Sequence, residues 1–211
     1  MKIEIWSDVL CPFCYIGKRN FEKALSEFEH AGDVDVNWKS FQLDPETKTF
    51  TGKNIHEYLA EKKGGTVEWA KEMNDRVTRM AREAGLKYDM DRAIPANSFD
   101  AHRLTHLAAS RGLQAKMEER LFAAYFTEGK NIGDHPTLVG LGKEIGLDPA
   151  DIQTMLSRSD FADEVRADIE EASSLGIRGV PFFVMDRKYG VSGAQPSEAF
   201  LETLRETWQK R

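Results

Sequence analysis

The N-terminal segment reads Ile3-Glu4-Ile5-Trp6-Ser7-Asp8-Val9-Leu10-Cys11-Pro12-Phe13-Cys14, and it contains both cysteines of the 211-residue sequence. The apolar run at residues 3–6 predicts a β-strand, and apolar side chains recur at helical spacing from Cys14 onwards. Pro12 suits the first turn of a helix, where a backbone N–H would be unpaired in any case. The segment therefore predicts a strand followed by a helix whose N-terminus carries two thiols.

The spacing of these thiols favours disulfide exchange. Residues three apart on a helix share one face, at a separation that a disulfide can bridge. Unpaired N–H groups and the positive end of the helix dipole stabilise an anion, so a thiol there should ionise more readily than a free cysteine. The apolar stripe that continues through Phe21 and Leu25 turns Cys14 inward and leaves Cys11 at an exposed tip. We expect Cys11 to attack and Cys14 to resolve.

Other chemistries of a cysteine pair are weaker alternatives. A zinc site would need two more ligands, and His102 and His106 have a suitable mutual spacing. They lie roughly ninety residues after the cysteines, however, whereas zinc fingers separate the two pairs by about 12–15 residues. A structural disulfide or two inert core thiols also stay open, although disulfides in the cytoplasm are usually catalytic or redox-sensing. We expect no metal.

Composition narrows the class of protein. The sequence has 41% hydrophobic residues, enough to bury a sizeable core, and a net charge of −6 from 29 basic and 35 acidic residues. This balance gives no electrostatic footprint for nucleic acid. The charged start Met1-Lys2-Ile3-Glu4 lacks the apolar region of a secretory signal, and no apolar run is long enough for a membrane span. We therefore expect a cytoplasmic protein with no nucleic-acid or membrane partner.

The two ends of the chain differ from its middle. Strand patterns recur at residues 34–38 and 182–185, followed by a turn, a short return near Tyr189 and a closing helix that begins near Pro196. The middle is helical, with predicted N-caps at Asp134 and Asp148. We predict an α/β domain formed by residues 1–53 and 177–211, with an all-helical domain inserted at residues 54–176.

Four motifs carry a resemblance to a known family. They are Ser7-Asp8-Val9-Leu10-Cys11-Pro12, Asn97-Ser98-Phe99-Asp100-Ala101-His102-Arg103-Leu104, Leu121-Phe122-Ala123-Ala124-Tyr125-Phe126 and Gly176-Ile177-Arg178-Gly179-Val180-Pro181-Phe182-Phe183-Val184. With them the chain resembles the DsbA family of thioredoxin-fold oxidoreductases, and more closely its FrnE-like branch. That superfamily also contains 2-hydroxychromene-2-carboxylate isomerases and kappa-class glutathione transferases. The resemblance implies a thioredoxin fold with a large helical insertion, and dithiol–disulfide exchange on protein substrates.

The resemblance also implies roles for particular residues, among them a cis peptide bond between Val180 and Pro181 beside the cysteines. Phe13 stands where periplasmic relatives often have histidine, so we expect a weaker oxidant. His102 and Arg103 lie on a helix that borders the active-site cleft in the family. The implied catalytic residues are Cys11, Cys14 and Pro181, and the implied substrate-binding residues are Pro12, Phe13 and Val180.

Glu4 is a further candidate, on physical grounds. It lies in the first strand, which is central and covered on both faces in a thioredoxin-like sheet, so its carboxylate could be buried below the helix start. Burial would favour the protonated form, which could relay the proton that leaves Cys14. Alternatively, Glu4 reaches solvent or pairs with Lys39.

These observations predict a cytoplasmic thiol-disulfide oxidoreductase or disulfide isomerase that acts on protein thiols and disulfides without an organic cofactor. Glutathione stays open as a redox partner. One alternative is a glutathione-dependent isomerase or transferase acting on small molecules, although the members of that branch typically have serine at the position of Cys11. Another is a non-catalytic holdase that binds unfolded chains through its helical domain. The physiological substrate, the redox direction and the oligomeric state are left open.

Overall fold

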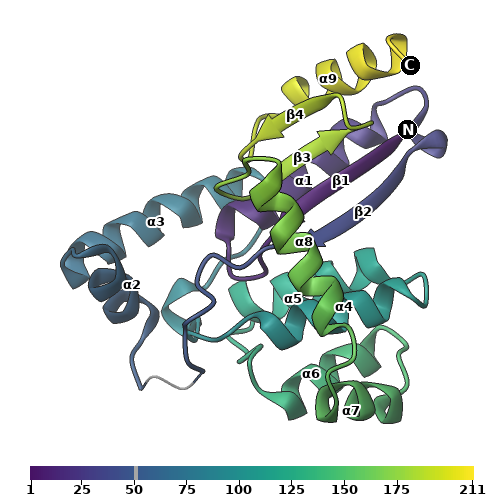
Figure 1. Cartoon of the computed structure of the whole chain (residues 1–211). Coiled ribbons are helices and arrows are strands. Elements are labelled where there is room, and N and C mark those ends of the chain that lie inside the picture. The colour runs from purple at the N-terminus through teal and green to yellow at the C-terminus, as the bar shows by residue number, and fades with distance from the viewer. Residues whose placement is uncertain (50–51) are drawn as a thin grey trace. The chain divides into compact units, whose positions relative to one another are not determined.

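The computed structural model of the chain describes residues 1–49 and 52–211, which form two compact units (Figure 1). An α/β unit comprises Met1–Leu43 and Arg166–Arg211, and a helical unit comprises Asp44–Val165. Both boundaries differ from the predicted ones at residues 53/54 and 176/177. The second segment of the α/β unit begins earlier in the chain than predicted. The reason is that the greater part of the helix before the third strand packs on the sheet of this unit.

The α/β unit contains a four-stranded mixed sheet in the order β2-β1-β3-β4. The central strand β1 is parallel to β2 and antiparallel to β3, and β3 forms a hairpin with β4. This is the thioredoxin-like fold that the sequence predicts. The strands are β1 (Lys2–Ser7), β2 (Asp35–Ser40), β3 (Phe182–Met185) and β4 (Tyr189–Ser192).

Helices α1 (Pro12–Ser26) and α9 (Ser197–Gln209) pack on one face of this sheet (Figure 1). The Phe183 ring lies 5.4 Å from the ring of Phe21 in α1 and 4.5 Å from the ring of Phe200 in α9. Side chains alternate between the faces of a strand, and Ile5 is paired with Phe183. Ile5 and Ser7 therefore point to the α1 face, and Glu4 and Trp6 point to the opposite face.

Helix α8 (Ala162–Ser174) lies against that opposite face. Trp6 is fully buried against Ala172 of this helix, and its Nε1 donates a hydrogen bond of 2.9 Å to the Asp168 carbonyl. The Asp168 carboxylate in turn accepts hydrogen bonds from Lys39 Nζ at 2.8 Å and from Ser40 N at 2.9 Å. These buried bonds attach α8 to the sheet, and they explain why the α/β unit includes the chain from residue 166.

The helical unit contains six of the α-helices in the described chain. Asp134 and Asp148 cap two of them as predicted, because their carboxylates accept hydrogen bonds from the backbone N–H groups of Thr137 and Ala150. Among the described residues no helix is long and apolar enough to cross a membrane. The helices are α2 (Ile55–Lys63), α3 (Val67–Glu83), α4 (Phe99–Ala109), α5 (Gln114–Phe126), α6 (His135–Glu144) and α7 (Pro149–Ser157), and short 3₁₀ helices occur at Ala31–Asp33 and Met90–Arg92.

Candidate active site

The two cysteines lie at the start of α1, as the sequence predicts. Cys11 is the N-cap residue, Pro12 opens the helix, and the backbone N–H of Cys14 donates to the Cys11 carbonyl at 3.0 Å. Cys11 is only 4% exposed and Cys14 is fully buried, so Cys11 does not form the exposed tip that we expected. Its sulfur instead lies 3.5 Å from the carbonyl oxygen of Val180. Phe13 is 37% exposed beside the pair.

The environment of Cys14 favours its protonated form. Burial raises the pKa of the Cys14 thiol well above its ordinary value, and the hydrogen bond and negative charge of Cys11 raise it further. The side chain of Ser7 and the backbone N–H of Asp8 act in the opposite direction, as donors that favour a thiolate. Cys14 is thus held as a thiol that can donate to the sulfur of Cys11, so the two sulfurs have different environments.

Val180 and Pro181 bring the far end of the chain to the dithiol. The peptide bond between them is cis, as the resemblance implies. The Pro181 carbonyl accepts a hydrogen bond of 2.8 Å from the backbone N–H of Gly193, which ties this loop to the end of the β3–β4 hairpin. The carbonyl of Val180 consequently faces the sulfur that we expect to attack.

Gly17 is a site residue that the sequence analysis missed. It lies one turn after Cys14, and a Cβ atom added at Gly17 would meet Cγ of Pro181 at 3.0 Å. Carbon atoms in favourable contact are about 3.5–4.0 Å apart, so only glycine allows α1 to approach this loop so closely. The available signal was a glycine inside a helical pattern, which often has a packing reason.

Asp8 was also missed, and it fixes the turn that leads to Cys11. Its side chain is fully buried, and its carboxylate accepts hydrogen bonds from the backbone N–H groups of Leu10 at 3.2 Å and Leu43 at 2.8 Å. Its carbonyl accepts a further bond of 2.9 Å from the N–H of Cys11. An aspartate that bonds the backbone two residues later is a common turn former, which was the signal in the sequence.

Glu4 does not join the dithiol. The carboxylate is buried as predicted, but it points to the α8 face of the sheet and forms an ion pair with Arg187, whereas Cys14 lies on the α1 face. Lys2 Nζ lies 3.1 Å from the same carboxylate. The suggested pairing with Lys39 is also absent, because Lys39 bonds Asp168 instead. The geometry thus gives Glu4 a place in an ion-pair network and does not support a proton relay to Cys14.

His102 and Arg103 are both buried in α4 of the helical unit. The Arg103 guanidinium donates to the carbonyls of Met155, Arg158 and Asp160, at and beyond the C-terminal end of α7. Carbonyls at the end of a helix lack intrahelical partners, so these bonds stabilise the end of α7. Arg103 therefore has a structural part within its own unit, and its predicted place beside a cleft stays a prediction.

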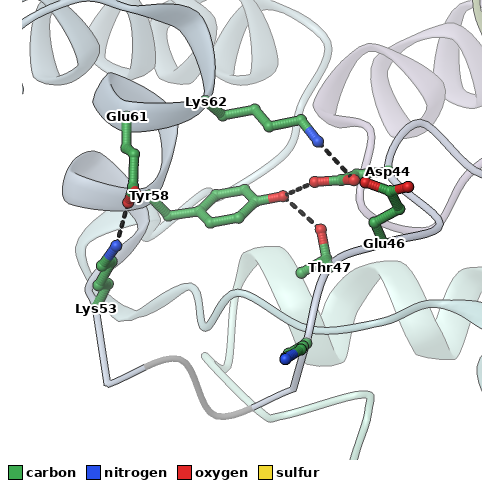
Figure 2. A pocket seen from close by; sticks show the side chains of 8 residues that line it. Asp44, Glu46, Thr47, Lys53, Tyr58, Glu61 and Lys62 are labelled. Atoms are coloured by element: carbon green, nitrogen blue, oxygen red, sulfur yellow. Dashed lines mark hydrogen bonds and ion pairs between the residues drawn. The ribbon is translucent and has the colours of Figure 1, made fainter.

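The helical unit also contains a cavity of about 510 Å³, shown in Figure 2. The Tyr58 hydroxyl points to the carboxylate of Asp44 and to Thr47, while Lys62 Nζ lies 2.6 Å from Asp44 Oδ1. Partial burial favours the neutral acid, but the bonds from Lys62, Thr47 and Tyr58 outweigh it and lower the pKa of Asp44 to about 2. Lys53 is likewise paired with Glu61. Four of the charged side chains that line the cavity are thus already paired, and the dithiol is the stronger candidate site.

The described residues, 1–49 and 52–211, contain no group of three or more His, Cys, Asp or Glu side chains placed to hold a metal ion.

Comparisons with known proteins agree with the thioredoxin-like fold. Residues 2–205 match the model of the DSBA-like thioredoxin domain. A probable DsbA oxidoreductase from Streptomyces coelicolor is 41% identical, with a TM-score of 0.95 over all of this chain and 91% of that one. Cytosolic disulfide reductase DsbM from Pseudomonas aeruginosa, solved with glutathione, is 22% identical with a TM-score of 0.67 over 98% of this chain and all of that one. A 2-hydroxychromene-2-carboxylate isomerase is 14% identical with a TM-score of 0.69, over all of this chain and 95% of that one. At such low identity the last two likenesses concern the fold alone.

Proposed function

Since the chain belongs to the DsbA-like thioredoxin-domain family, we propose that it is a thiol-disulfide oxidoreductase acting on protein substrates through Cys11 and Cys14. One observation carries the proposal: a thiol at the N-terminus of α1 lies beside a second, fully buried thiol that can donate to it. Attack by one sulfur and resolution by the other need this asymmetry.

The reaction proceeds in two exchanges. The Cys11 thiolate attacks one sulfur of a substrate disulfide, that S–S bond breaks, and the departing thiolate takes up a proton. Cys14 then loses its proton and attacks Cys11, which forms the Cys11–Cys14 disulfide and releases the second substrate thiolate. That thiolate takes up the proton that Cys14 lost, so the substrate gains two electrons and two protons while the protein is oxidised. The reverse sequence oxidises a substrate.

Two features support an extended polypeptide as the substrate. The Val180 carbonyl lies 3.5 Å from the sulfur of Cys11, so a substrate sulfur bound to Cys11 would lie beside this backbone group. Once Cys11 is in a mixed disulfide it has no proton to donate, and the carbonyl is then open to a substrate N–H. Phe13 adds an exposed apolar contact next to the dithiol.

Glutathione is the reductant that fits the proposal, and the cytoplasm is the compartment. The DsbM structure that resembles this chain is of a cytosolic disulfide reductase and contains glutathione. A reducing compartment keeps a dithiol of this kind reduced and ready to attack. A small tripeptide thiol would use the same approach to Cys11 as a protein substrate.

Reduction of insulin disulfides tests the proposal. The full chain is compared with Cys11→Ser, with Cys14→Ser and with the double variant, in the presence of glutathione to measure turnover and in its absence to trap adducts. We expect turnover by the unmodified chain alone, no reaction with Cys11→Ser, and a covalent insulin adduct trapped on Cys14→Ser. Equal activity of both single variants would contradict the dithiol mechanism.

The same variants separate the alternatives. A glutathione-dependent enzyme for small molecules would conjugate or isomerise its substrate with glutathione and retain activity when Cys14 is replaced. The likeness to a 2-hydroxychromene-2-carboxylate isomerase is the observation that favours this class. A holdase would suppress aggregation of an unfolding client even as the double cysteine variant.

A further inference from the structure

Ser7 is a buried residue whose hydroxyl the fold leaves without an ordinary partner. It ends β1, is 1% exposed and is fixed through its backbone, because its carbonyl accepts a hydrogen bond of 3.0 Å from the N–H of Phe41. In the described part of the chain, Ser7 Oγ has no hydrogen-bond partner within normal distance. A buried hydroxyl without a bond is unfavourable, so its position calls for an explanation.

The explanation lies in the group that this hydroxyl faces. Ser7 points to the α1 face of the sheet, the face on which the buried Cys14 lies, and its hydroxyl acts to lower the pKa of the Cys14 thiol. A neutral thiol is a weak acceptor, whereas a thiolate is a strong one. A hydrogen bond that Ser7 Oγ does not form while Cys14 is a thiol can therefore form when the thiolate appears, because catalytic hydrogen bonds often tighten only as the reaction proceeds.

A second donor converges on the same sulfur. The backbone N–H of Asp8 also favours the Cys14 thiolate. Cys11 is the titratable group that raises the pKa of Cys14, together with burial. Ser7 and Asp8 thus provide a two-donor site for an anion at a position where burial and Cys11 both oppose one.

We propose that the Ser7 hydroxyl is a catalytic group of the resolving step, which donates a hydrogen bond to the Cys14 sulfur as that sulfur becomes a thiolate. This inference rests on the proposed dithiol exchange. In that step the Cys14 S–H bond breaks, a bond forms between the two cysteine sulfurs, and the bond from Cys11 to the substrate breaks. The departing thiolate takes up the proton, while Ser7 keeps its own proton throughout.

The expected effect follows from the strength of the bond. A hydrogen bond to a charged group changes the equilibrium for thiolate formation by about tenfold or more. The Cys14 thiolate of a variant without the hydroxyl is more basic, and nucleophilicity rises with basicity along a Brønsted slope of about 0.4–0.5. Each thiolate of the variant is therefore about threefold more reactive, which offsets part of the lower thiolate population. Ser7→Ala should therefore slow resolution by about three- to fourfold while Cys14 is mainly protonated, and this deficit should shrink as Cys14 ionises.

The test uses an aromatic disulfide whose thiolate is coloured. Its first release of colour reports attack by Cys11, and its second release reports resolution by Cys14. Both are followed from neutral to alkaline pH in the unmodified chain and in Ser7→Ala. We expect an unchanged first release and a slower second release in Ser7→Ala, with the midpoint of its pH profile displaced upward by about one unit.

Threonine and valine at position 7 form a matched pair, because they have nearly the same shape but only threonine keeps the hydroxyl. Ser7→Thr should keep the midpoint of the unmodified chain, and Ser7→Val should show the upward displacement expected of Ser7→Ala. The pair therefore tests the hydroxyl even if Ser7→Ala fails to fold. A second release that is unchanged without the hydroxyl, or slowed equally at every pH, would overturn the role of Ser7. A missing second release in the unmodified chain would instead refute the dithiol mechanism itself.

Discussion

Gly17→Ala tests the close packing that holds α1 against the Pro181 loop. The added Cβ would lie 3.0 Å from Cγ of Pro181, 3.4 Å from Cα of Ala194 and 3.5 Å from Cζ of Phe183. The first contact is roughly 0.5 Å too short for carbon atoms, and overpacking of this kind costs about 1–3 kcal/mol. Alanine also favours the helical conformation over glycine by about 1 kcal/mol, which offsets part of that cost.

Gly140→Ala is the matched control for this substitution. Gly140 lies inside α6, and a Cβ there would have no neighbour within 4 Å. The control should gain about 1 kcal/mol from helix propensity alone, so the two variants should differ in free energy of unfolding by about 1–3 kcal/mol.

Thermal unfolding followed by circular dichroism measures this difference. In a chain of this size, 1 kcal/mol corresponds to about 2–4 °C in Tm, so Gly17→Ala should melt clearly below Gly140→Ala. Its rate of insulin reduction should fall as well, because the alanine displaces Pro181 from the dithiol. Equal stabilisation by the two alanines would refute the reasoning about α1.

Three further predictions concern residues outside the dithiol. The pKa of Asp44 is lowered to about 2, so its contribution to stability is present above the pKa of about 3.8 for the unfolded chain and is lost as pH falls towards 2. Asp44→Asn should therefore lower the Tm at neutral pH and change the Tm little near pH 2. Thermal melts at the two pH values measure this difference. Glu4→Gln should lower stability through the loss of its ion pair, yet leave the pH profile of the Cys14-dependent colour release unchanged; a displaced midpoint would restore the proton relay. Arg103→Met should destabilise the helical unit by about 3 kcal/mol or more in urea unfolding, since it removes the guanidinium that bonds the carbonyls of Met155, Arg158 and Asp160. A loss below about 1 kcal/mol would contradict the structural part assigned to Arg103.

Local signals in the sequence were sufficient for much of the fold. The thiols, Pro12 and the apolar stripe predicted the start of α1, and Asp134 and Asp148 predicted helix N-termini that the structure contains. These features depend on neighbours within one or two turns, so they can be recognised from composition and spacing alone.

Long-range contacts were not predictable in the same way. The partner of Glu4 is Arg187, which lies 183 residues later in the chain at the turn of the β3–β4 hairpin, and no periodic pattern connects the two. The boundary within α8 depends on Asp168, whose bonds to β2 are formed only in the folded sheet. The sulfur of Cys11 likewise contacts a carbonyl far along the chain, that of Val180.

A redox titration of the full chain tests the dithiol mechanism most directly. The protein is equilibrated in graded glutathione buffers, quenched with acid and examined by mass for free thiols. If the mechanism is right, Cys11 and Cys14 lose their thiols together in one two-electron transition, with a potential between about −270 mV for a reductase and about −120 mV for a strong oxidant. A stable glutathione adduct on one cysteine, with no intramolecular disulfide at any buffer composition, would contradict it.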